Sequence, residues 1–430
     1  MNMISETRQD SPVIGEYDVV VCGAGPAGIG AALAAARAGA RTVLIEAAGC
    51  LGGVWTSGLL SFVLDSKNKG GLLREICDRL SSEQSFLLQS SGTSKHYDGS
   101  SDFTYDAEGM KHILEALCVE SGVEVRLHTR VVASKRENKH IAFVFTESNS
   151  GREAFSAPVF IDCSGNGELA ARSGCGFDIG HPETGQTQPA TMLALISGVP
   201  GQQESTLNDA TKRMFLETLR RAGVEPTYRS PSLFRLPHPQ LYGLMVNHEY
   251  GVRCDNAKEM TDATIHARGE IYRIVQALST LPEWSEVRLV STASQIGLRE
   301  GRRVHGLYTV TVQDIVAGAR FEDGICLVEF PVDIHALDSS STEAVTKEGV
   351  TAQSYHIPFR SLVAKDVTNL LLAGRCISGD FYAHASYRVT GNAVPMGEAA
   401  GLGAALAAKA GISLHELEGR EVRERLQNQF

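Results

Sequence analysis

The 430-residue sequence has no apolar run that approaches the roughly 18 to 20 residues of a membrane-spanning helix. Its opening segment, Met1 to Glu16, is polar and of mixed charge, and it lacks the apolar centre of a signal peptide. No Cys-x-x-Cys pair is present, and the nine cysteines fall at irregular spacing. This excludes the common zinc patterns and the disulfide framework of a small secreted domain. We therefore expect a cytoplasmic protein with reduced cysteines, no metal and no membrane segment.

Positive charge is also scarce. Lys and Arg number 40 against 50 Asp and Glu, which gives a formal net charge of −10. Because phosphate contacts need clustered Lys and Arg, the composition does not favour a nucleic acid as partner. The 43% of hydrophobic residues is typical of a globular protein, and the chain is long enough for two domains. We expect a small-molecule substrate, and the sequence leaves association into a homo-oligomer open.

The first fifty residues follow a strand–helix–strand pattern. Residues 17–22 are apolar, residues 26–38 are Ala-rich with helical spacing and stop at Gly39, and residues 41–46 are apolar again. This pattern predicts one βαβ unit. Downstream we predict helices near 72–80 and 108–120, a Ser-rich loop at 81–101, and strands at 123–127, 131–134, 142–146, 153–155 and 159–163.

The middle of the chain has a different character. Residues 177–356 mix strands and helices without a nucleotide-type turn, and they are followed by an apolar strand at 369–373 and an Ala-rich helix at 394–410. We predict an α/β fold in which both ends of the chain, residues 1–176 and 357–430, form a discontinuous Rossmann-type cofactor domain. Residues 177–356 would form an inserted mixed α+β substrate domain. No internal repeat is visible.

A glycine motif, Gly-Ala-Gly-Pro-Ala-Gly at 23–28, lies between the first predicted strand and helix. Gly23 permits the tight turn, Gly25 lets the backbone approach a pyrophosphate, and Gly28 lets helix and strand pack closely. The helix N-terminus offers free N–H groups and a partial positive charge. Glu46 ends the next strand, where its carboxylate would accept the ribose hydroxyls of an adenosine. The motif therefore predicts a dinucleotide site, and by itself it leaves NAD and FAD open.

Three further segments favour FAD. LGGVWTSG at 51–58 follows the ribose acid directly, IDCSGNG at 161–167 is a second glycine turn after a strand, and LLAGRCISGD at 371–380 is a strand that enters a third glycine loop. We assign to the cofactor site Gly23, Gly25, Pro26, Ala27, Gly28, Glu46, Gly52, Gly53, Trp55, Thr56, Ser57, Val131, Ser164, Gly165, Gly374, Arg375, Gly391, Asn392 and Ala393.

At these residues the chain resembles the broad family of FAD-dependent oxidoreductases with a glutathione-reductase or succinate-dehydrogenase type of FAD fold. The resemblance extends over 295–306 (QIGLREGRRVHG), 331–335 (PVDIH), 357–362 (IPFRSL), 373–378 (AGRCIS) and 384–401. It implies a Rossmann-type FAD-binding domain and FAD as cofactor, but no particular substrate, because members act on varied ones. Residues 388–393 (RVTGNA) depart from the family's Arg-Val followed by small residues. Arg375 replaces a common acid and could pair with a phosphate.

Several kinds of flavin chemistry are disfavoured. The C-x-x-x-x-C dithiol of disulfide reductases would fall where Trp55 and Leu60 stand, and Cys50 and Cys376 have no partner in sequence, so we interpret both as packing residues. No second Gly-x-Gly-x-x-Gly follows an apolar strand, so no dedicated NAD(P)H domain is visible. The loop at 51–58 contains no histidine, which predicts non-covalent FAD.

His384 and Arg388 are the first catalytic candidates, because the i, i+4 spacing would place them on one helix face. Arg388 could clamp a carboxylate and His384 could move a proton, although His384 could equally support the flavin loop. In the closing helix, Pro395 suits the first turn. The helix dipole and the N–H groups of Gly391 and Asn392 would stabilise negative charge on the flavin.

Two other groups of charged residues are candidates. Asp333 and His335 alternate on a predicted strand end, so they would point to one side as an acid–base pair or as a structural orienting pair. Arg299, Glu300, Arg302 and Arg303 form a dense charge cluster, which is either a solvated surface or, as the resemblance suggests, partly interior; Arg299 is the catalytic candidate among them.

The residues therefore predict an FAD-dependent oxidoreductase that exchanges a hydride between a small polar organic substrate and the flavin. One alternative is an NAD(P)H-driven flavin monooxygenase or halogenase. Another is a non-catalytic flavin-binding module for electron transfer.

Overall fold

The computed structural model describes residues 10–88, 102–201, 205–206, 208–341 and 343–428. Its centre is a five-stranded sheet of order β22-β11-β2-β3-β7, in which every neighbouring pair is parallel. The strands are β2 (Val19–Cys22), β3 (Thr42–Ile45), β7 (Glu124–Arg126), β11 (Val159–Asp162) and β22 (Leu370–Leu372). All but β7 are fully buried, which explains their continuous apolar sequences. Strands from both ends of the chain thus share one sheet, as the sequence predicts.

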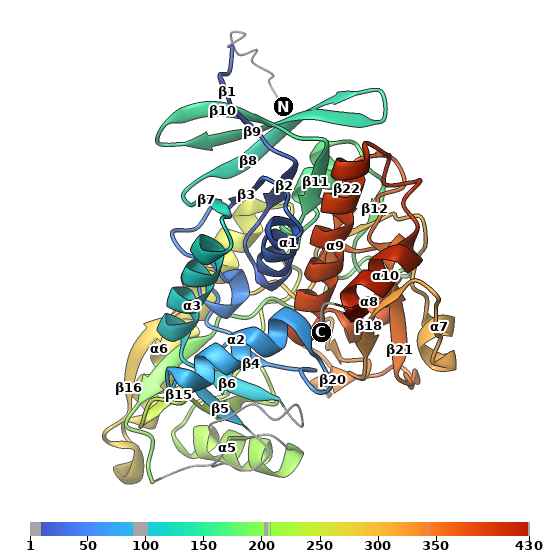
Figure 1. Ribbon diagram of the computed structural model, residues 1–430. Helices are drawn as coiled ribbons and strands as arrows, with labels where there is room; N and C mark the ends of the chain where they lie inside the picture. Colours follow the sequence, from blue (N-terminus) through green and yellow to red (C-terminus); the bar gives the residue numbers. More distant parts are fainter. Residues whose placement is uncertain (1–9, 89–101, 202–204, 207, 342, 429–430) are drawn as a thin grey trace, which may run out of the picture.

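Helices α1 (Pro26–Arg37) and α9 (Thr390–Ala410) run side by side next to this sheet (Figure 1). Their backbones approach so closely that glycine is required at the contacts. A Cβ atom on Gly397 would lie 2.0 Å from the carbonyl oxygen of Ala27, and one on Gly401 would lie 2.1 Å from that of Ala31. On α1, a Cβ on Gly30 would lie 2.5 Å from the carbonyl oxygen of Val394. This packing fixes the end of the chain against the glycine motif at its beginning.

The two further helices predicted in the first half are present with small shifts, as α2 (Gly71–Ser82) and α3 (Ala107–Glu120). A short helix that was not predicted, α4 (Glu168–Arg172), follows β11. A four-stranded sheet at the top of Figure 1 contains β1 (Val13–Glu16), β10 (Gly151–Ser156), β9 (His140–Ser148) and β8 (Arg130–Glu137).

The loop predicted at 81–101 is wrong in its first part. A strand, β5 (Phe86–Leu88), forms there and pairs with β6 (Phe103–Tyr105), which in turn pairs with β4 (Phe62–Val63). Residues 89–101 of that loop lie outside the described residues. The strand forms because Phe86 and Leu88 are buried and Phe86 stacks on Phe103 at a ring-centroid distance of 4.8 Å.

A second hydrophobic core belongs to the inserted part of the chain. It surrounds an antiparallel sheet of order β14-β15-β13-β16 together with α5 (Asp209–Arg221) and α6 (Ala257–Leu278). The strands are β13 (Ala194–Ser197), β14 (Ser232–Arg235), β15 (Leu241–Met245) and β16 (Arg288–Thr292). The members of this core between Ala190 and Ile296 come from the insertion, and Leu59 and Ala107 join them from the first domain.

The end of the insertion returns to the first core. Val304, Val328 and Tyr355 are buried in the cluster that contains the parallel sheet. The elements in and around this region are β12 (Phe177–Asp178), β17 (Arg303–Val304), α7 (Val312–Ala317), β18 (Gly324–Val328), β19 (Ile334–His335), β20 (Val345–Thr346), β21 (Tyr355–Pro358), α8 (Phe381–Tyr387) and α10 (Gly419–Asn428). The division of the chain at 177–356 stays a prediction, and the residues of this range after about 300 pack on the side of the parallel sheet.

The closing helix starts earlier than its sequence predicts. Helix α9 begins at Thr390, so Pro395 lies inside the helix and not in its first turn. The N–H group of Gly391 donates to the carbonyl of Leu64 at 3.1 Å, and the N–H of Asn392 donates to the carbonyl of Val389 at 3.1 Å. The predicted use of these two N–H groups for the flavin is therefore wrong, because both already have acceptors within the protein.

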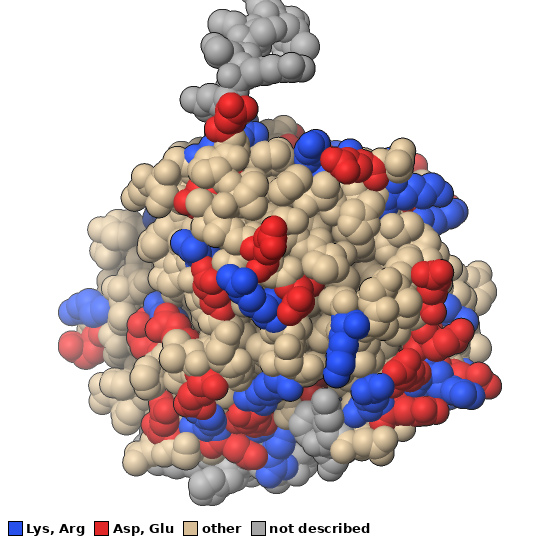
Figure 2. All heavy atoms as spheres, turned by 45° about the horizontal axis from the view of Figure 1, so that its top comes forward, with Lys and Arg blue, Asp and Glu red and all other residues tan. Residues whose placement is uncertain are grey.

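The surface is mixed in charge. On the face shown in Figure 2, Lys and Arg lie among Asp and Glu. Ion pairs at the surface of the protein include Arg74 with Asp78 and Arg79 with Glu120. None of the helices in the described ranges is long and apolar enough to cross a membrane.

The α1–α9 contact makes a testable prediction. Gly397→Ala should reduce the free energy of unfolding by about 1 to 3 kcal/mol, because the added methyl group cannot fit against the Ala27 carbonyl without moving a helix. The measurement is the midpoint of urea denaturation. Gly269→Ala in the interior of α6 is the control, since only the tip of Arg273 lies near its Cβ, at 3.4 Å. The control should be neutral or stabilising, by up to about 1 kcal/mol. Equal midpoints for both variants would contradict the prediction.

Candidate active site

The glycine motif forms an open cradle at the N-terminus of α1. Gly23 has a φ of +98°, and a Cβ on Gly28 would lie 1.8 Å from the Gly23 carbonyl oxygen, so neither position accepts a side chain. A Cβ on Gly25 would have no atom within 4 Å. The space in front of Gly25 is therefore open, and the first N–H groups of α1, after Pro26, lack acceptors within the helix. This arrangement fits a phosphate group.

Glu46 lies beside this cradle at the end of β3. Its carboxylate accepts hydrogen bonds from the backbone N–H groups of Ala24 at 2.7 Å and Ala48 at 2.8 Å. The two bonds hold the side chain against the glycine motif. The predicted contact with a ribose remains a proposal.

The segment 51–58 closes over the glycine motif. Gly52 and Gly53 have φ angles of +102° and +54°, and a Cβ on Gly53 would lie 2.9 Å from Cα of Gly25. The hydroxyl of Thr56 donates to the carbonyl of Leu51. The carbonyl of Ser57 accepts from the N–H of Ser294 at 3.0 Å, which ties this segment to the insertion.

Trp55 is fully buried, and it lies in the core under the segment and does not line the cavity described below. Its carbonyl accepts a hydrogen bond from the hydroxyl of Tyr105 at 2.9 Å. Val131 is half-buried on β8, opposite Thr146 of β9.

The second glycine turn is held by a buried acid. Asp162 accepts from the N–H and the hydroxyl of Ser164, at 3.0 and 2.6 Å, and from the N–H of Ala170 at 2.9 Å. Burial raises the pKa of Asp162. The N–H and the hydroxyl of Ser164 are both engaged in the turn, and its predicted contact with a cofactor stays a prediction. Gly165 has a φ of +71°, which favours glycine, and a Cβ there would lie 2.7 Å from Nη2 of Arg375.

Several buried polar atoms around these loops have no partner in the described part of the chain. They are Nε of Arg375, the hydroxyl of Thr390 and Nδ2 of Asn392. Arg375 donates only to Oδ1 of Asn166, at 3.1 Å, and burial lowers its pKa. A buried donor without an acceptor is costly, so these atoms point to a bound polar group. Together with the space at Gly25 they fit a flavin dinucleotide. Gly374, with a φ of +84°, and the buried Ala393 also lie in these loops.

A cavity of about 500 Å³ lies between the 51–58 segment, the start of α9 and the sheet of the insertion. Its lining combines apolar side chains from both domains with a charged group of residues. The lining consists of Val54, Gly58, Leu60, Phe62, Leu64, Asp102, Thr191, Leu193, Thr206, Lys212, Ser232, Leu233, Phe234, Met245, Gly297, Leu298, Arg299, Asp333, His335, Arg375, Arg388, Val389 and Thr390.

The structure brings four of the five predicted catalytic residues to this cavity: Arg299, Asp333, His335 and Arg388. Nη2 of Arg388 donates to Oδ2 of Asp333 at 2.9 Å and to its carbonyl at 2.9 Å. Arg299 donates from Nη1 to the carbonyl of Pro189 at 2.7 Å and to the hydroxyl of Thr191 at 2.6 Å. Burial lowers the pKa of Arg299 to about 10.

His335 is held from three sides. Its Nε2 lies 3.3 Å from Oδ2 of Asp333, its Nδ1 lies 3.1 Å from Nε2 of His248, and its backbone N–H donates to Gln188 at 3.1 Å. Burial, followed by the positive charge of Arg299, lowers the pKa of His335 to about 4, so the imidazole is neutral at pH 7. Burial alone would raise the pKa of Asp333, but His335, Arg388 and Arg299 outweigh it and lower that pKa well below its ordinary value.

His384 lies elsewhere. It is on α8, fully buried, and is not part of the cavity lining. Neither ring nitrogen has a partner among the described residues, and burial lowers its pKa well below the ordinary value. The i, i+4 relation to Arg388 holds for the backbone, because Arg388 N–H donates to the His384 carbonyl at 3.1 Å. It does not bring the two side chains into one cavity.

The charge cluster at 299–303 is interior. Glu300 and Arg303 form a buried ion pair at 2.6 Å, and Glu300 also accepts from the N–H groups of Gly180 and Gln188. Arg302 donates to the carbonyl of Asn166 at 2.9 Å. The solvated-surface interpretation of these residues is therefore wrong. Glu300 and Arg303 fix the loop that carries Arg299.

Sequence reasoning missed the residues that support His335 and Arg299. Gln188, Thr191 and His248 are buried contacts of the site, and Tyr228 stacks near His248 with ring centroids 4.0 Å apart. They come from the insertion, where no motif marks them. The only signal was an isolated polar residue in an apolar stretch, which is too common to single them out.

The cysteines do not form a redox pair. All nine thiols are free. Cys50 Sγ lies 3.3 Å from the hydroxyl of Ser57, and Cys376 Sγ donates to the carbonyl of Asp162 at 3.3 Å. Burial raises the pKa of the Cys376 thiol, which makes it unreactive as a thiolate.

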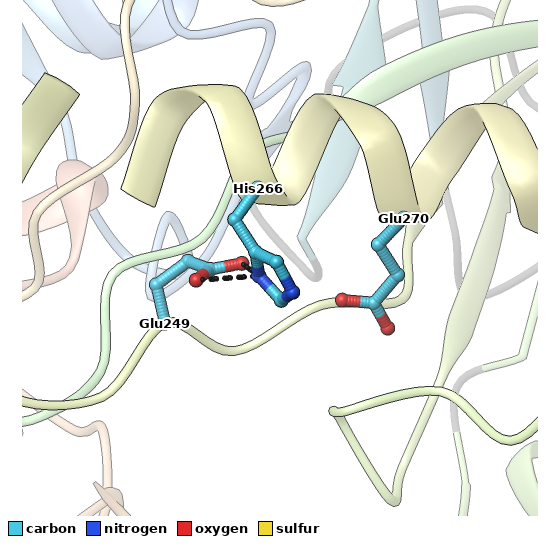
Figure 3. A group of neighbouring side chains, drawn as sticks. All are labelled: Glu249, His266 and Glu270. Carbon is cyan, nitrogen blue, oxygen red and sulfur yellow. Dashed lines mark hydrogen bonds and ion pairs between the residues drawn. The ribbon is translucent and has the colours of Figure 1, made fainter. Parts of the chain in front are cut away.

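A second polar cluster lies outside the cavity. Figure 3 shows His266 between Glu249 and Glu270, with ligand-type atoms within 4.8 Å of one another. Nδ1 of His266 lies 3.0 Å from both carboxylate oxygens of Glu249. Glu270 accepts from the N–H and the hydroxyl of Thr227, each at 2.7 Å. Burial raises the pKa of both glutamates. The hydrogen bonds explain the cluster without an ion.

Comparison with solved structures shows which fold this is. A geranylgeranyl bacteriochlorophyll reductase-like protein from Thermoplasma acidophilum is similar over 96% of this chain and 83% of its own, with a TM-score of 0.52 and 14% identity. A p-nitrophenol 4-monooxygenase from Pseudomonas putida is similar over 97% and 87%, with a TM-score of 0.52 and 12% identity. A flavin-dependent brominase is similar over 96% and 83%, with a TM-score of 0.51 and 13% identity. At these identities the likeness shows the fold alone.

Sequence comparison is more specific. No curated protein matches the chain. The family described as FAD dependent oxidoreductase matches residues 18–426, which span both ends of the cofactor domain and the whole insertion. The glycine cradle, the second glycine turn and the interior Arg299 to Arg303 loop all lie within this match. The chain belongs to the FAD-dependent oxidoreductase family, and its cofactor is FAD.

Proposed function

We propose that this FAD-dependent oxidoreductase exchanges a hydride between a small organic substrate in the cavity and non-covalently bound FAD. One observation supports this above all: Arg299, Arg388, Asp333 and His335 meet in the same cavity as Val54, Gly58 and Thr390, which border the cofactor loops. Groups that can hold an anion and accept a proton thus lie next to the place proposed for the flavin ring.

FAD would be held by residues that the structure leaves open. The N-terminus of α1 at Gly25 would take the pyrophosphate, Glu46 the ribose, and Arg375, Thr390 and Asn392 polar atoms of the flavin half. When bound, FAD supplies a ring that accepts or donates a hydride. The 51–58 segment contains no histidine or other residue that would suggest a covalent link.

His335 is the group that would handle the substrate's proton. An imidazolium formed when His335 accepts a proton would be stabilised as an ion pair with Asp333, whose Oδ2 lies 3.3 Å from Nε2 of His335. Asp333 is itself fixed by Arg388, so the pair keeps its geometry while the proton moves. Arg388 and Arg299 would anchor a negatively charged or strongly polar group of the substrate.

The experiment that tests this function is anaerobic bleaching of the flavin by a panel of metabolites. Loss of the oxidised flavin spectrum with one substrate class supports hydride exchange. The fold is shared with a p-nitrophenol monooxygenase and a brominase. Rapid reoxidation in air with a hydroxylated or halogenated product would therefore favour the oxygen-dependent alternative. No turnover over the whole panel would favour an electron-transfer module.

The cofactor site predicts a yellow protein that releases unmodified FAD when denatured. Glu46→Gln should weaken FAD binding by about 1.5 kcal/mol, or roughly ten-fold, because a charged acceptor is lost. The measurement is titration of the apoprotein with FAD by flavin fluorescence. Glu16→Gln on the exposed strand β1 is the control and should bind FAD normally. Unchanged affinity in Glu46→Gln, or yellow colour retained on the precipitated chain, would contradict the proposed site.

The proton role predicts a difference between two buried histidines. His335→Gln should lower the rate of substrate-dependent bleaching by roughly 10²-fold with normal FAD content, which is the usual contribution of a general acid or base. His384→Gln carries the same substitution outside the cavity and should have the smaller effect on this rate. If His384→Gln is bleached more slowly than His335→Gln while it retains FAD, the proton role belongs to His384. If it loses FAD and regains the normal rate when FAD is added, His384 supports the cofactor.

The low pKa of His335 predicts an unusual pH profile. A histidine with the ordinary pKa of about 6.5 would protonate, and the oxidation rate would fall, as the pH drops through that value. With a pKa of about 4, His335 stays unprotonated, so the rate of substrate oxidation should remain flat from pH 8 to pH 5. The measurement is the anaerobic bleaching rate against pH. An inflection near pH 6.5 that disappears in His335→Gln would show that its pKa is not lowered.

A further inference from the structure

The charged side chains that line the cavity carry more positive than negative charge. Arg299, Arg375 and Arg388 line it, and Asp333 is the carboxylate that faces them as an ion-pair partner of Arg388. In the described part of the chain Arg299 and Arg375 have no carboxylate partner, because their acceptors are carbonyl, hydroxyl and amide oxygens. The two other charged residues of the lining, Lys212 and Asp102, are of opposite sign and together add no net charge. Buried charge without a partner is strongly unfavourable, so the ligands must bring negative charge.

One of these three arginines would contact the cofactor, and the other two would not. Arg375 lies against Asn166 and Gly165 in the second glycine turn, on the side proposed for FAD. Arg299 and Arg388 remain, and Asp333 compensates one of them. One positive charge is therefore left for the substrate. Arg388 lines the cavity and its side chain is 10% exposed. Its Nε has no acceptor among the described residues.

Most of the other lining side chains are apolar, and they come from both parts of the chain. Leu60, Phe62 and Leu64 stand on the cofactor side, and Leu193, Leu233, Phe234 and Met245 stand on the sheet of the insertion. Phe62 and Phe234 meet across the domain boundary with ring centroids 5.9 Å apart. A hydroxyl-rich substrate such as a sugar would lose its hydration against this wall and find few partners, mainly Thr206 and Ser232.

We propose that the substrate is an amphipathic monoanion, whose carboxylate lies between Arg299 and Arg388 and whose aliphatic or aromatic body lies against Leu60, Phe62, Leu193 and Phe234. This rests on the proposed function, since it assumes that the substrate and FAD share the cavity. It replaces the small polar substrate expected from the sequence with one that is polar at a single end. Arginine suits this role because its planar fork matches a carboxylate.

The test is a binding measurement on the FAD-loaded protein with matched acid and amide probes. Hexanoate and 4-phenylbutyrate are compared with hexanamide and 4-phenylbutyramide, and acetate represents the anion without an apolar body. Binding is read by calorimetry and by perturbation of the visible FAD spectrum, so no turnover is needed. At least one long acid should bind about ten-fold or more tightly than its amide and than acetate, as expected for a charged hydrogen-bonded contact.

Substitutions test which residues cause the preference for acids over amides. Arg299→Met and Arg388→Met should each reduce the ratio of the acid's affinity to the amide's affinity toward one. Phe234→Ser should weaken binding of the long acid and leave the affinity for acetate unchanged. Arg299→Lys, which keeps the charge but loses the fork, should give an intermediate ratio if Arg299→Met fails to fold. Arg268→Met is the control, because Arg268 is exposed on α6 and does not line the cavity. It should retain the full ratio.

The outcomes separate this proposal from the function on which it rests. A ratio near one in the unmodified protein, a ratio that survives in both arginine variants, or no binding by any acid would overturn the substrate class. Selective acid binding without bleaching by any organic acid in the metabolite panel would instead sustain the anionic apolar site and overturn hydride exchange. A protein that lacks bound FAD in the visible spectrum would overturn both.

Discussion

The close approach of two helix backbones is the constraint on which the site depends. Gly30, Gly397 and Gly401 allow α1 and α9 to touch at distances that no side chain would permit. The first helix after the glycine motif is thereby locked to the last long helix of the chain, and β22 is added to the edge of the same sheet. Arg388 and Thr390, which precede and open α9, thereby line one cavity with Val54 and Gly58 of the 51–58 segment. A looser contact would move Arg388, the proposed substrate anchor, away from the proposed cofactor site.

The residues around the glycine loops also include buried polar atoms that have no hydrogen-bond partner in the described part of the chain. Among the described residues, Arg375, Arg388, Thr390 and Asn392 each carry a buried polar atom without a hydrogen-bond partner. The buried carboxylates nearby are paired: Glu300 with Arg303 and two N–H groups, and Asp162 with Ser164 and Ala170. Nε of Arg302 and Nε of Arg303 also lack a partner in the described part of the chain, so an unpaired atom does not by itself identify a ligand contact. Arg375, Arg388 and Thr390 differ from these two residues because they also line the cavity.

Sequence patterns predict the cofactor half well because its constraints are local. The order of β2, the glycine motif and α1 and the acid at Glu46 depend on steric rules within a few residues, and the structure has them where the sequence predicts. The start of α9 was misplaced because Gly391 and Asn392 suggest a loop, whereas the bond from Gly391 to Leu64 allows the helix to begin before them. The pairing of His335 with His248 joins residues far apart in the chain, so no spacing could reveal it.

The substrate half is not constrained by local sequence motifs in this way. Leu193, Leu233 and Met245 line the cavity from a part of the chain that carries no motif, and their identities can change without disturbing the glycine cradle, because they pack in a separate core. A reductase-like protein, a monooxygenase and a brominase can accordingly share this fold while they differ in their reactions. The chemistry of this family member must therefore be sought in the inner face of the insertion and in Arg299, which the buried Glu300–Arg303 pair holds against it. The proposed substrate site nevertheless combines this inner face with Leu60, Phe62 and Arg388 from the two ends of the chain, so a change of substrate would require changes in both parts.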